Sequence, residues 1–297
     1  MKRFNPIFAS IVFAFGLSTT TLAADDDWAP VAKALGRSGA QLPGGIYRVG
    51  LGRSDLKVTL DEVAIRPTLA LGSYLAFQKM GGMGMVMGDL VLLHEEVNPV
   101  MKKLVEGGIE ITALHNHLLR SSPATMYMHF YGRGDPVKLA AALRAGLAES
   151  KTPLAAPAPA GSPPPPLDID TATIDQTLGA KGSVNSGVYA FNIPRVETIM
   201  EDGMPIPIGM GSGIVINFQP TGGGKAAITG DFVLIASEVN PVLKTLREGG
   251  IEVTALHSHM LTEQPRLFFM HFWANDDAGK LARSLKAALN KVKLAKN

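Results

Sequence analysis

The chain has 297 residues, of which 46% are hydrophobic and 18% are charged. This composition excludes an intrinsically disordered protein and is typical of globular domains, and the length is sufficient for two of them. The sequence contains 28 basic and 26 acidic side chains and no basic patch interleaved with aromatic residues, so we expect no nucleic-acid partner. The absence of cysteine excludes disulfides, thiolate ligands and a thiol nucleophile.

Residues 1–24 have the pattern of a cleavable signal peptide. Lys2 and Arg3 precede an apolar run from Ile7 to Leu17, and small residues follow up to Ala24. The apolar run is too short to span a bilayer comfortably, so we expect no transmembrane segment in the mature chain. Removal of two basic residues leaves 28 − 2 = 26 basic against 26 acidic side chains. The prediction is a neutral mature protein in the periplasm or outside the cell.

Residues 25–147 are predicted to form a first domain. A short helix is expected over 27–37, followed by strands over 45–51, 56–65, 74–78 and 85–93. Asn98-Pro99 has the pattern of a helix start, and Gly107-Gly108 would end that helix. Two strand-like runs around Ser121-Ser122-Pro123 come next, and Asp135-Pro136 opens a last helix.

The same order of elements returns after an Ala/Pro-rich linker at residues 148–167, so residues 168–297 are predicted to be a second copy of the domain. Residues 88–147 and 230–289 share 33 identities in 60 positions without a gap. The order of helices and strands predicts an α+β fold of two homologous domains, each a largely antiparallel sheet with helices packed on one face. Two such domains could also pack on each other as an intramolecular pseudo-dimer.

Six of the seven histidines recur at matching positions of the two copies. They are His115, His117 and His129 in the first copy and His257, His259 and His271 in the second. Residues 109–117 alternate with the period of a strand, so the first two histidines of each triplet should share one face, ~7 Å apart. If the next run pairs antiparallel around Pro123, His129 lies opposite His117, and three imidazoles converge within each copy.

Three histidines with an open fourth position are the arrangement of catalytic zinc sites. An all-nitrogen triplet therefore predicts a divalent metal as cofactor, with zinc favoured and copper as the alternative. The competing interpretation is that the histidines are structural and satisfied by backbone carbonyls.

Acidic candidates come from positions that both copies keep. Glu96 and Glu238 precede the Asn-Pro pairs and are the predicted general bases, although acidic groups near a helix start are also favourable by themselves. Asn98 and Asn240 are interpreted as helix caps, and Asp89 and Asp231 as turn residues. Arg53 and Arg195 are expected in ion pairs within their domains rather than in an anion site. Met83, Met85 and Met87 occur in the first copy only and favour core packing over a copper(I) site.

Long shared motifs connect the chain to a known family. The strings Gly-Asp-Leu-Val-Leu, Glu-Val-Asn-Pro-Val, Gly-Ile-Glu-Ile-Thr-Ala-Leu-His-Asn-His and Met-His-Phe-Tyr-Gly-Arg-Gly-Asp resemble the LppY/LpqO family of bacterial envelope proteins. The resemblance covers essentially the whole predicted mature chain, twice over. It implies a location in the cell envelope and little about activity. Some members are lipoproteins, and this sequence lacks the cysteine that a lipid anchor requires.

Three functional hypotheses follow. The first is an exported tandem-domain protein with a three-histidine metal site in each repeat that acts as a metal-dependent hydrolase, with Glu96 or Glu238 as the base. The second is a non-catalytic periplasmic zinc- or copper-binding protein. The third is an envelope binding or scaffolding module in which the histidines are structural. The small-molecule or envelope ligand is not identified by the sequence.

Overall fold

The computed structural model describes residues 27–155 and 166–295. The predicted signal peptide and the central part of the predicted linker lie outside these described residues. None of the helices in the described ranges combines the length and the hydropathy that a membrane crossing requires.

Each repeat forms one antiparallel sheet of six strands. In repeat 1 the spatial order is β1 (Ala40–Leu42), β2 (Ile46–Gly52), β5 (Gly72–Met80), β6 (Met83–Leu93), β8 (Thr125–Gly134) and β7 (Glu110–His115). In repeat 2 it is β9 (Ser183–Asn185), β10 (Val188–Ile193), β13 (Ile214–Gly222), β14 (Lys225–Leu234), β16 (Phe268–Asp277) and β15 (Glu252–His257). The prediction of two similar domains with largely antiparallel sheets is therefore confirmed.

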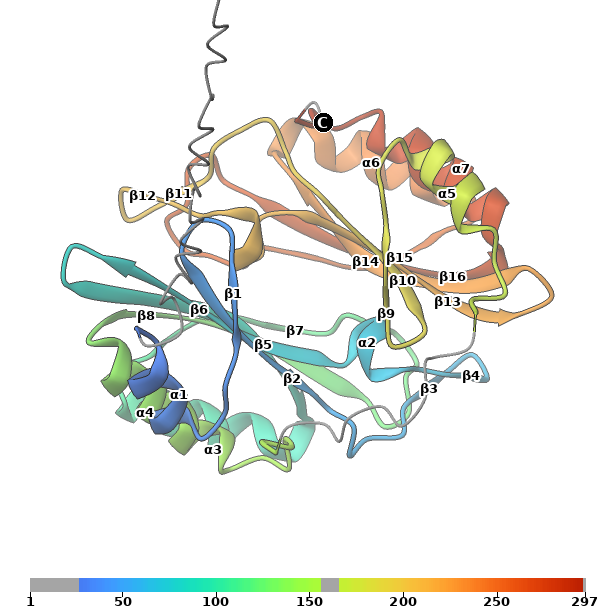
Figure 1. Cartoon of the computed structure of the whole chain (residues 1–297). Helices are drawn as coiled ribbons and strands as arrows, with labels where there is room; N and C mark the ends of the chain where they lie inside the picture. Colours follow the sequence, from blue (N-terminus) through green and yellow to red (C-terminus); the bar gives the residue numbers. More distant parts are fainter. Residues whose placement is uncertain (1–26, 156–165, 296–297) are drawn as a thin grey trace, which may run out of the picture.

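The short helix α2 (Pro67–Ala70) lies on the inner side, against β5 of its own repeat and β13 and β14 of repeat 2 (Figure 1). The other α-helices cover the outer face of each sheet, as the sequence predicts. They are α1 (Ala29–Leu35), α3 (His94–Glu106) and α4 (Pro136–Leu147) in repeat 1, and α5 (Thr171–Leu178), α6 (Ala236–Glu248) and α7 (Ala278–Leu289) in repeat 2. The inner faces of the two sheets are turned toward each other. The molecule is thus a four-layer stack, and the centre of the stack lies between the repeats.

The alternation of side chains along β6 explains how one strand serves both faces. Val86, Leu90 and Leu92 belong to the core beneath the helices of repeat 1. Met85 and Met87 point the other way and pack into the core that includes repeat 2. Because neighbouring side chains of a strand point to opposite faces, Asp89 also lies on the inner face. The central strands therefore carry a polar residue to the interface between repeats.

Two small hairpins link the repeats reciprocally. The segment predicted as one strand over 56–65 forms two short strands instead, β3 (Thr59–Leu60) and β4 (Val63–Ala64), because Asp61 and Glu62 take positive φ values and turn the chain. Its counterpart in repeat 2 is β11 (Met200–Glu201) with β12 (Met204–Pro205). Trp273 donates a 3.0 Å hydrogen bond to Asp61, and Tyr131 donates one of 3.0 Å to Asp202. Each hairpin thus binds an aromatic residue of the other repeat.

The long helix of each repeat begins earlier than predicted. α3 starts at His94, so Asn98-Pro99 lies inside it, and Asn240 likewise lies inside α6. The expectation that the two asparagines cap these helices is wrong. The Glu96 carboxylate closes the first turn instead, by accepting a 2.9 Å hydrogen bond from the Leu93 N–H.

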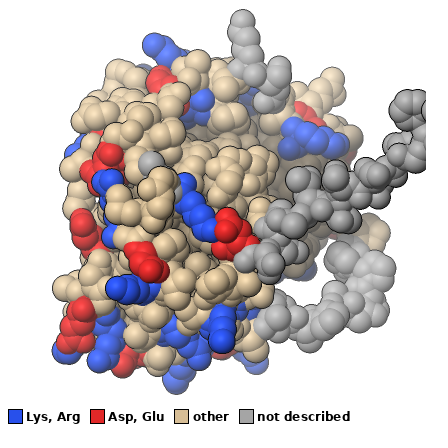
Figure 2. Space-filling view, turned by 60° about the vertical axis from the view of Figure 1, so that its left-hand side comes forward, with Lys and Arg blue, Asp and Glu red and all other residues tan. Residues whose placement is uncertain are grey.

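The surface shows no large field of one sign on the face seen in Figure 2, where basic and acidic side chains are interspersed. This distribution agrees with the near balance of 28 basic and 26 acidic residues in the sequence. A strongly charged partner has no obvious docking surface on that face.

Candidate metal centre

The central strands place one aspartate and one histidine side by side in each repeat. Asp89 on β6 is the direct antiparallel partner of His129 on β8. Asp231 on β14 is likewise the partner of His271 on β16. Both pairs lie on the inner faces of their sheets. The interpretation of Asp89 and Asp231 as turn residues is therefore wrong, because both stand within long strands.

A glycine precedes each aspartate for a steric reason. A Cβ on Gly88 would lie 2.1 Å from the Tyr74 carbonyl oxygen, and a Cβ on Gly230 would lie 2.0 Å from the Val215 carbonyl oxygen. Neither distance is compatible with a side chain. The repeated Gly-Asp pair thus combines close strand packing with a carboxyl group on the opposite face.

The remaining histidines come from the strand at the edge of each sheet and from the loop that follows it. His115 ends β7 and His117 lies two residues beyond. The predicted register is wrong, because Ala113, not His117, lies opposite His129. The pairing is shifted by four residues along the first strand. The connection between β7 and β8 is not a tight turn around Pro123, and a bulge interrupts β7 between Ile111 and Ala113. The three imidazoles of repeat 1 nevertheless converge, with ligand nitrogens within 4.8 Å of one another.

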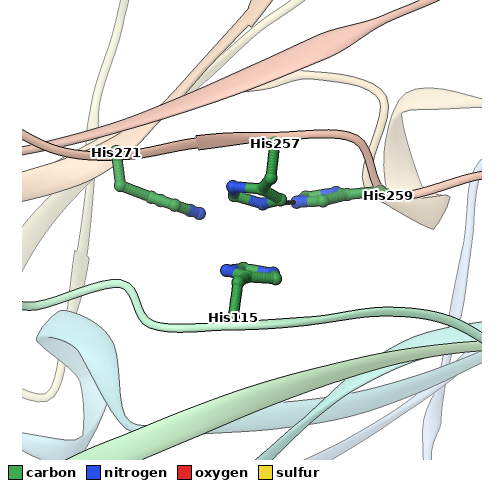
Figure 3. Close-up of side chains that lie close together, drawn as sticks. All are labelled: His115, His257, His259 and His271. Atoms are coloured by element: carbon green, nitrogen blue, oxygen red, sulfur yellow. Dashed lines mark hydrogen bonds between the residues drawn. The ribbon is translucent and has the colours of Figure 1, made fainter.

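The two triplets form one cluster rather than separate sites. The ring centroids of His115 and His257 lie 3.4 Å apart across the interface. His117 lies 3.7 Å from His271, and His129 lies 3.7 Å from His259, in a nearly twofold-symmetric arrangement. A second group within 4.8 Å joins His115 of repeat 1 to His257, His259 and His271 of repeat 2 (Figure 3). The predicted triplet of repeat 1 is thus one group of ligand atoms, whereas the predicted triplet of repeat 2 is joined by His115 of repeat 1.

Buried polar atoms without hydrogen-bond partners concentrate in this cluster. In the part of the chain that the structure describes, twelve buried side-chain nitrogen and oxygen atoms have no partner, and seven belong here. They are Oδ1 of Asp89 and Asp231, Nε2 of His115, His117, His129 and His271, and Nδ1 of His257. Unpaired buried polar atoms are costly in a stable fold and call for an explanation, such as a bound ion.

Burial also shifts the protonation of these groups. Desolvation lowers the pKa of His115 to about 4 and that of His271 to about 3. It also holds the pKa of His117, His129, His257 and His259 far below the usual value, and neighbouring imidazoles lower the pKa of all four further. The imidazoles are therefore neutral at pH 7, which is the form that binds metals.

The same burial acts on the aspartates in the opposite direction. Desolvation raises the pKa of Asp89 well above its ordinary value, and the nearby Arg48 guanidinium counteracts part of that rise. The pKa of Asp231 is raised by desolvation and then by the proximity of Asp89. The Asp89 carboxylate lies 3.8 Å from His117 and 3.9 Å from His129, and that of Asp231 lies 3.8 Å from both His259 and His271.

Hydrogen bonds orient two of the rings for ligation. The Nδ1 atom of His271 lies 2.9 Å from the Gly230 carbonyl, and that of His115 lies 3.0 Å from the Asn116 carbonyl. A proton on Nδ1 leaves the lone pair of Nε2 free in both residues. The Nε2 atoms of His257 and His259 lie 3.0 Å apart. Two nitrogens on one tetrahedral zinc lie about 3.3 Å apart, so this pair already has a suitable spacing.

The donor set therefore fits a metal ion of the zinc or copper type. All six imidazoles are neutral, inward-facing and largely without competing partners. Spacings near the 4.8 Å upper limit require two nitrogens to approach each other by about 1.5 Å around a single ion. Two carboxyl groups beside the rings supply oxygen donors for the remaining positions. No ion identity follows from this geometry alone.

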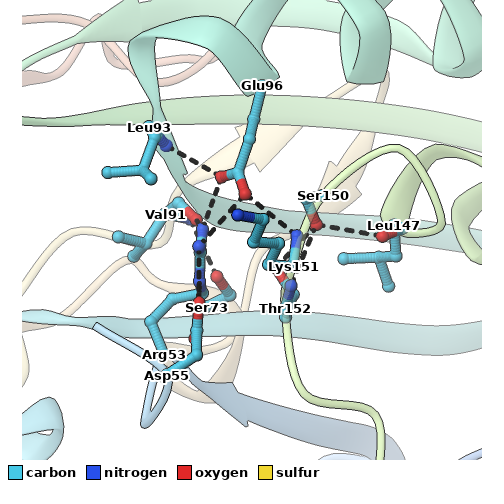
Figure 4. Close-up of polar contacts among 10 residues, drawn as sticks. All are labelled: Arg53, Asp55, Ser73, Val91, Leu93, Glu96, Leu147, Ser150, Lys151 and Thr152. Atoms are coloured by element: carbon cyan, nitrogen blue, oxygen red, sulfur yellow. Dashed lines mark hydrogen bonds and ion pairs between the residues drawn. The ribbon is translucent and has the colours of Figure 1, made fainter.

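Glu96 lies in different surroundings, where a buried arginine binds it (Figure 4), and Glu238 has equivalent contacts in repeat 2. Glu96 accepts hydrogen bonds of 2.7 and 3.2 Å from the buried Arg53 guanidinium and one of 2.9 Å from the Lys151 N–H. Glu238 is bound in the same way by Arg195 and the Lys293 N–H. Arginine lowers the pKa of both carboxyl groups against the opposing effect of burial. These contacts hold the start of the helix to the sheet and give no support to a role as general base.

A cavity of about 540 Å³ opens beside the histidines, between the repeats. Its lining includes both aspartates and four of the six histidines: Asp89, Asp231, His117, His129, His259 and His271. The lining also includes the exposed residues Gly50, Asn185 and Asn192, so solvent reaches the cavity. The volume is sufficient for a small organic molecule.

Comparison with known proteins identifies the family. A family model described as Domain of Unknown Function (DUF1259) matches residues 29–149 and again residues 172–291. The chain belongs to this family and carries two copies of its domain. No curated protein sequence matches the chain.

Two solved structures show only a remote likeness to this fold. One is a trimeric bacterial microcompartment shell protein, PduB, with 12% sequence identity over 85% of this chain and 89% of that chain, at a TM-score of 0.23. The other is EtuB from Clostridium kluyveri, with 9% identity over 86% and 90%, at a TM-score of 0.20. These scores are too low to inform the function.

Proposed function

We propose that the protein binds divalent transition-metal ions between its two repeats and uses them to hydrolyse a small molecule in the adjoining cavity. The single observation that carries the proposal is the convergence of six neutral histidines, five of which have a buried ring nitrogen without a hydrogen-bond partner. A purely structural role for the histidines would satisfy these atoms by hydrogen bonds within the protein.

The metal would supply Lewis acidity next to the cavity. Zinc is the proposed ion and copper the alternative, since neutral imidazole suits both. Asp89 and Asp231 replace Glu96 and Glu238 as the acidic groups of the proposed site. Their carboxyl groups line the cavity and stand within 4 Å of the histidines, so each can hold or accept a proton there.

Non-catalytic metal binding is the second candidate. Metal storage or transfer would also use a cluster of buried, neutral imidazoles. The cavity favours catalysis, because a storage site needs no space of about 540 Å³ for a further molecule. Met85 and Met87 are buried in the core, which favours their packing role over copper(I) binding.

We also propose that the protein acts outside the cytoplasm, in the periplasm or as a secreted protein. The signal-peptide pattern of residues 1–24 and the resemblance to the LppY/LpqO envelope proteins support this location. Export would separate the histidine cluster from the cytoplasmic metal pools.

Metal content of the purified protein tests the proposal. We expect at least one zinc or copper ion per chain by mass spectrometry, and loss of most of it in the His117→Ala, His259→Ala double variant. His94→Ala is the matched control, because His94 is exposed, lies outside the cluster and corresponds to Ala236 in repeat 2. Less than one ion per chain after incubation with zinc and copper salts, or equal metal content in the double variant, would overturn metal binding.

Catalysis is tested separately with chromogenic phosphate-ester and carboxylate-ester probes. We expect turnover by the metal-loaded protein that is abolished by a chelator and restored by the metal. A metal-loaded protein that turns over neither probe, while retaining its metal, would favour the second candidate.

A further inference from the structure

One wall of the cavity carries an arginine that the metal proposal does not use. Arg48, on β2, lines the cavity and is partly buried. Its guanidinium stacks on the Tyr74 ring, 3.7 Å from the ring centroid, and donates one hydrogen bond to the Gly209 carbonyl of repeat 2. These two contacts fix the plane of the guanidinium and leave most of its N–H groups without a protein acceptor.

Arg48 makes no ion pair with any carboxylate of residues 27–155 and 166–295. Arg53 and Arg195, by contrast, each bind two carboxylates. Among the described residues, the acidic side chains in the cavity lining are those of Asp89 and Asp231, and neither forms an ion pair with Arg48. A positive charge thus faces the cavity without a fixed negative partner in contact with it.

The cavity wall does not follow the repeat symmetry that the histidine cluster obeys. Ala190 stands in repeat 2 where repeat 1 has Arg48, since Tyr47 and Tyr189 are matching positions. Val215 pairs with Asp231 as Tyr74 pairs with Asp89, so the tyrosine also has no counterpart. The cavity therefore has one cationic end rather than two.

Amides complete the wall from the other repeat. Asn192 and Asn217 line the cavity, and the matching positions in repeat 1 are Gly50 and Ala76. Asn217 donates a 3.1 Å hydrogen bond to the Leu69 carbonyl, which orients its side chain. Asn217 lies directly beside Ala190, the position that matches Arg48, so the polar side chains that line the cavity differ between the two repeats.

We propose that the cavity binds a small molecule carrying an oxyanion, a carboxylate or a phosphate, whose oxygens are bound by Arg48 while its reacting part faces the histidine and aspartate cluster. Guanidinium binds both oxyanions through paired, charge-assisted hydrogen bonds. This inference rests on the proposed function, because it names the class of substrate for the same site.

Titration calorimetry with inorganic phosphate and with acetate tests the inference on the zinc-loaded full chain. We expect one of the two probes to bind, and Arg48→Ala to weaken that binding about 10- to 100-fold, the range expected for loss of a charge-assisted pair. The alanine is already present at the matching position of repeat 2, so the variant should fold. Arg48→Lys should bind with intermediate affinity, since it keeps the charge but loses the paired geometry.

Arg133→Ala is the matched control, because Arg133 is exposed and lies outside the cavity lining. Metal content is measured for every variant, and we expect it to be unchanged. Phosphate binding without acetate binding would identify a phosphorylated ligand, and the reverse a carboxylate. Absence of binding by both probes, or equal affinity in wild type and Arg48→Ala, would overturn the inference.

A wild-type chain without bound zinc would count against the proposed function and not against this inference. The titration would then be repeated on the metal-free chain, with the same two probes and the same variants. Loss of binding in Arg48→Ala would still support the oxyanion site.

Discussion

Single residues decide whether the cluster can form. The close approach of neighbouring strands at Gly88 and Gly230 leaves no space for a side chain, and the next residue in each strand is the aspartate that faces the histidines. The glycines therefore support the site only by allowing the neighbouring strands to pack closely.

We predict that Gly88→Ala destabilises the protein by about 2–4 kcal/mol, because its Cβ would lie 2.1 Å from the Tyr74 carbonyl oxygen and 2.7 Å from the Phe130 ring. Urea unfolding followed by circular dichroism measures the change. Gly50→Ala is the control, since a Cβ there meets nothing within 4 Å. Equal stabilities of the two variants would show that the strands separate more easily than the structure indicates.

The buried ion pair of each repeat gives a second prediction at this scale. Removing the carboxylate with Glu96→Ala should cost up to about 3 kcal/mol, because Arg53, with a side chain that is 0% exposed, would lose its buried partner and keep only Asp55. Metal content should stay at the wild-type value. A variant that folds with normal stability but loses its metal would restore Glu96 to the functional site.

At the scale of elements, the sequence predicts which helices and strands exist better than it predicts where they begin and end. Period-two alternation around His115 and His129 predicted inward-facing strands, and the repeat predicted two similar sheets. The start of α3 differs from the prediction because Asn98-Pro99 is a common helix start, whereas the observed N-cap, Leu93, lies five residues earlier and donates its N–H to the Glu96 carboxylate. The role of Asp89 was missed because a Gly-Asp pair is also common in turns, although its recurrence in both copies was a visible signal.

The reciprocal hairpins give a prediction at the same scale. Tyr131→Phe and Trp273→Phe each remove one hydrogen bond across the interface, to Asp202 and Asp61. Each should lower the free energy of unfolding by about 0.5–1.5 kcal/mol from the lost bond, with an added cost for the smaller ring in Trp273→Phe. Chemical denaturation measures both. No loss in either variant would mean that the hairpins do not hold the repeats together.

At the scale of the whole molecule, neither repeat alone could have revealed the shared cluster. The three cross-interface pairs of histidines arise only when the inner faces of the two sheets meet. The sequence specifies which side chains face inward, but the partner of that face is a tertiary contact between residues more than 100 positions apart. For this reason the sequence predicted two sites where the structure has one cluster.

The shared burial of six histidines predicts acid sensitivity of the metal-free protein. Their pKa values are lowered in the folded state, so below the ordinary histidine pKa of 6.5 the unfolded chain takes up protons that the folded chain does not. Stability should therefore fall as the pH decreases from 6.5 toward about 4. Asp89 and Asp231 act in the opposite sense, because their raised pKa values favour proton binding by the folded state, but they are two groups against six.

Thermal unfolding of the chelator-treated protein at a series of pH values measures this effect. The His117→Ala, His259→Ala variant should show a smaller decrease than wild type, whereas His94→Ala should match it. A melting temperature that does not fall between pH 6.5 and 4 would contradict the neutral, buried state of the cluster.

The central claim is that both repeats contribute ligands to one metal centre. Anomalous diffraction at the zinc edge, from crystals of the zinc-loaded protein, locates the ion directly. We predict an anomalous peak between the two sheets, bound by at least one histidine from the set His115, His117 and His129 and at least one from the set His257, His259 and His271. Zinc bound by the histidines of a single repeat, or found only on the outer surface, would contradict the account.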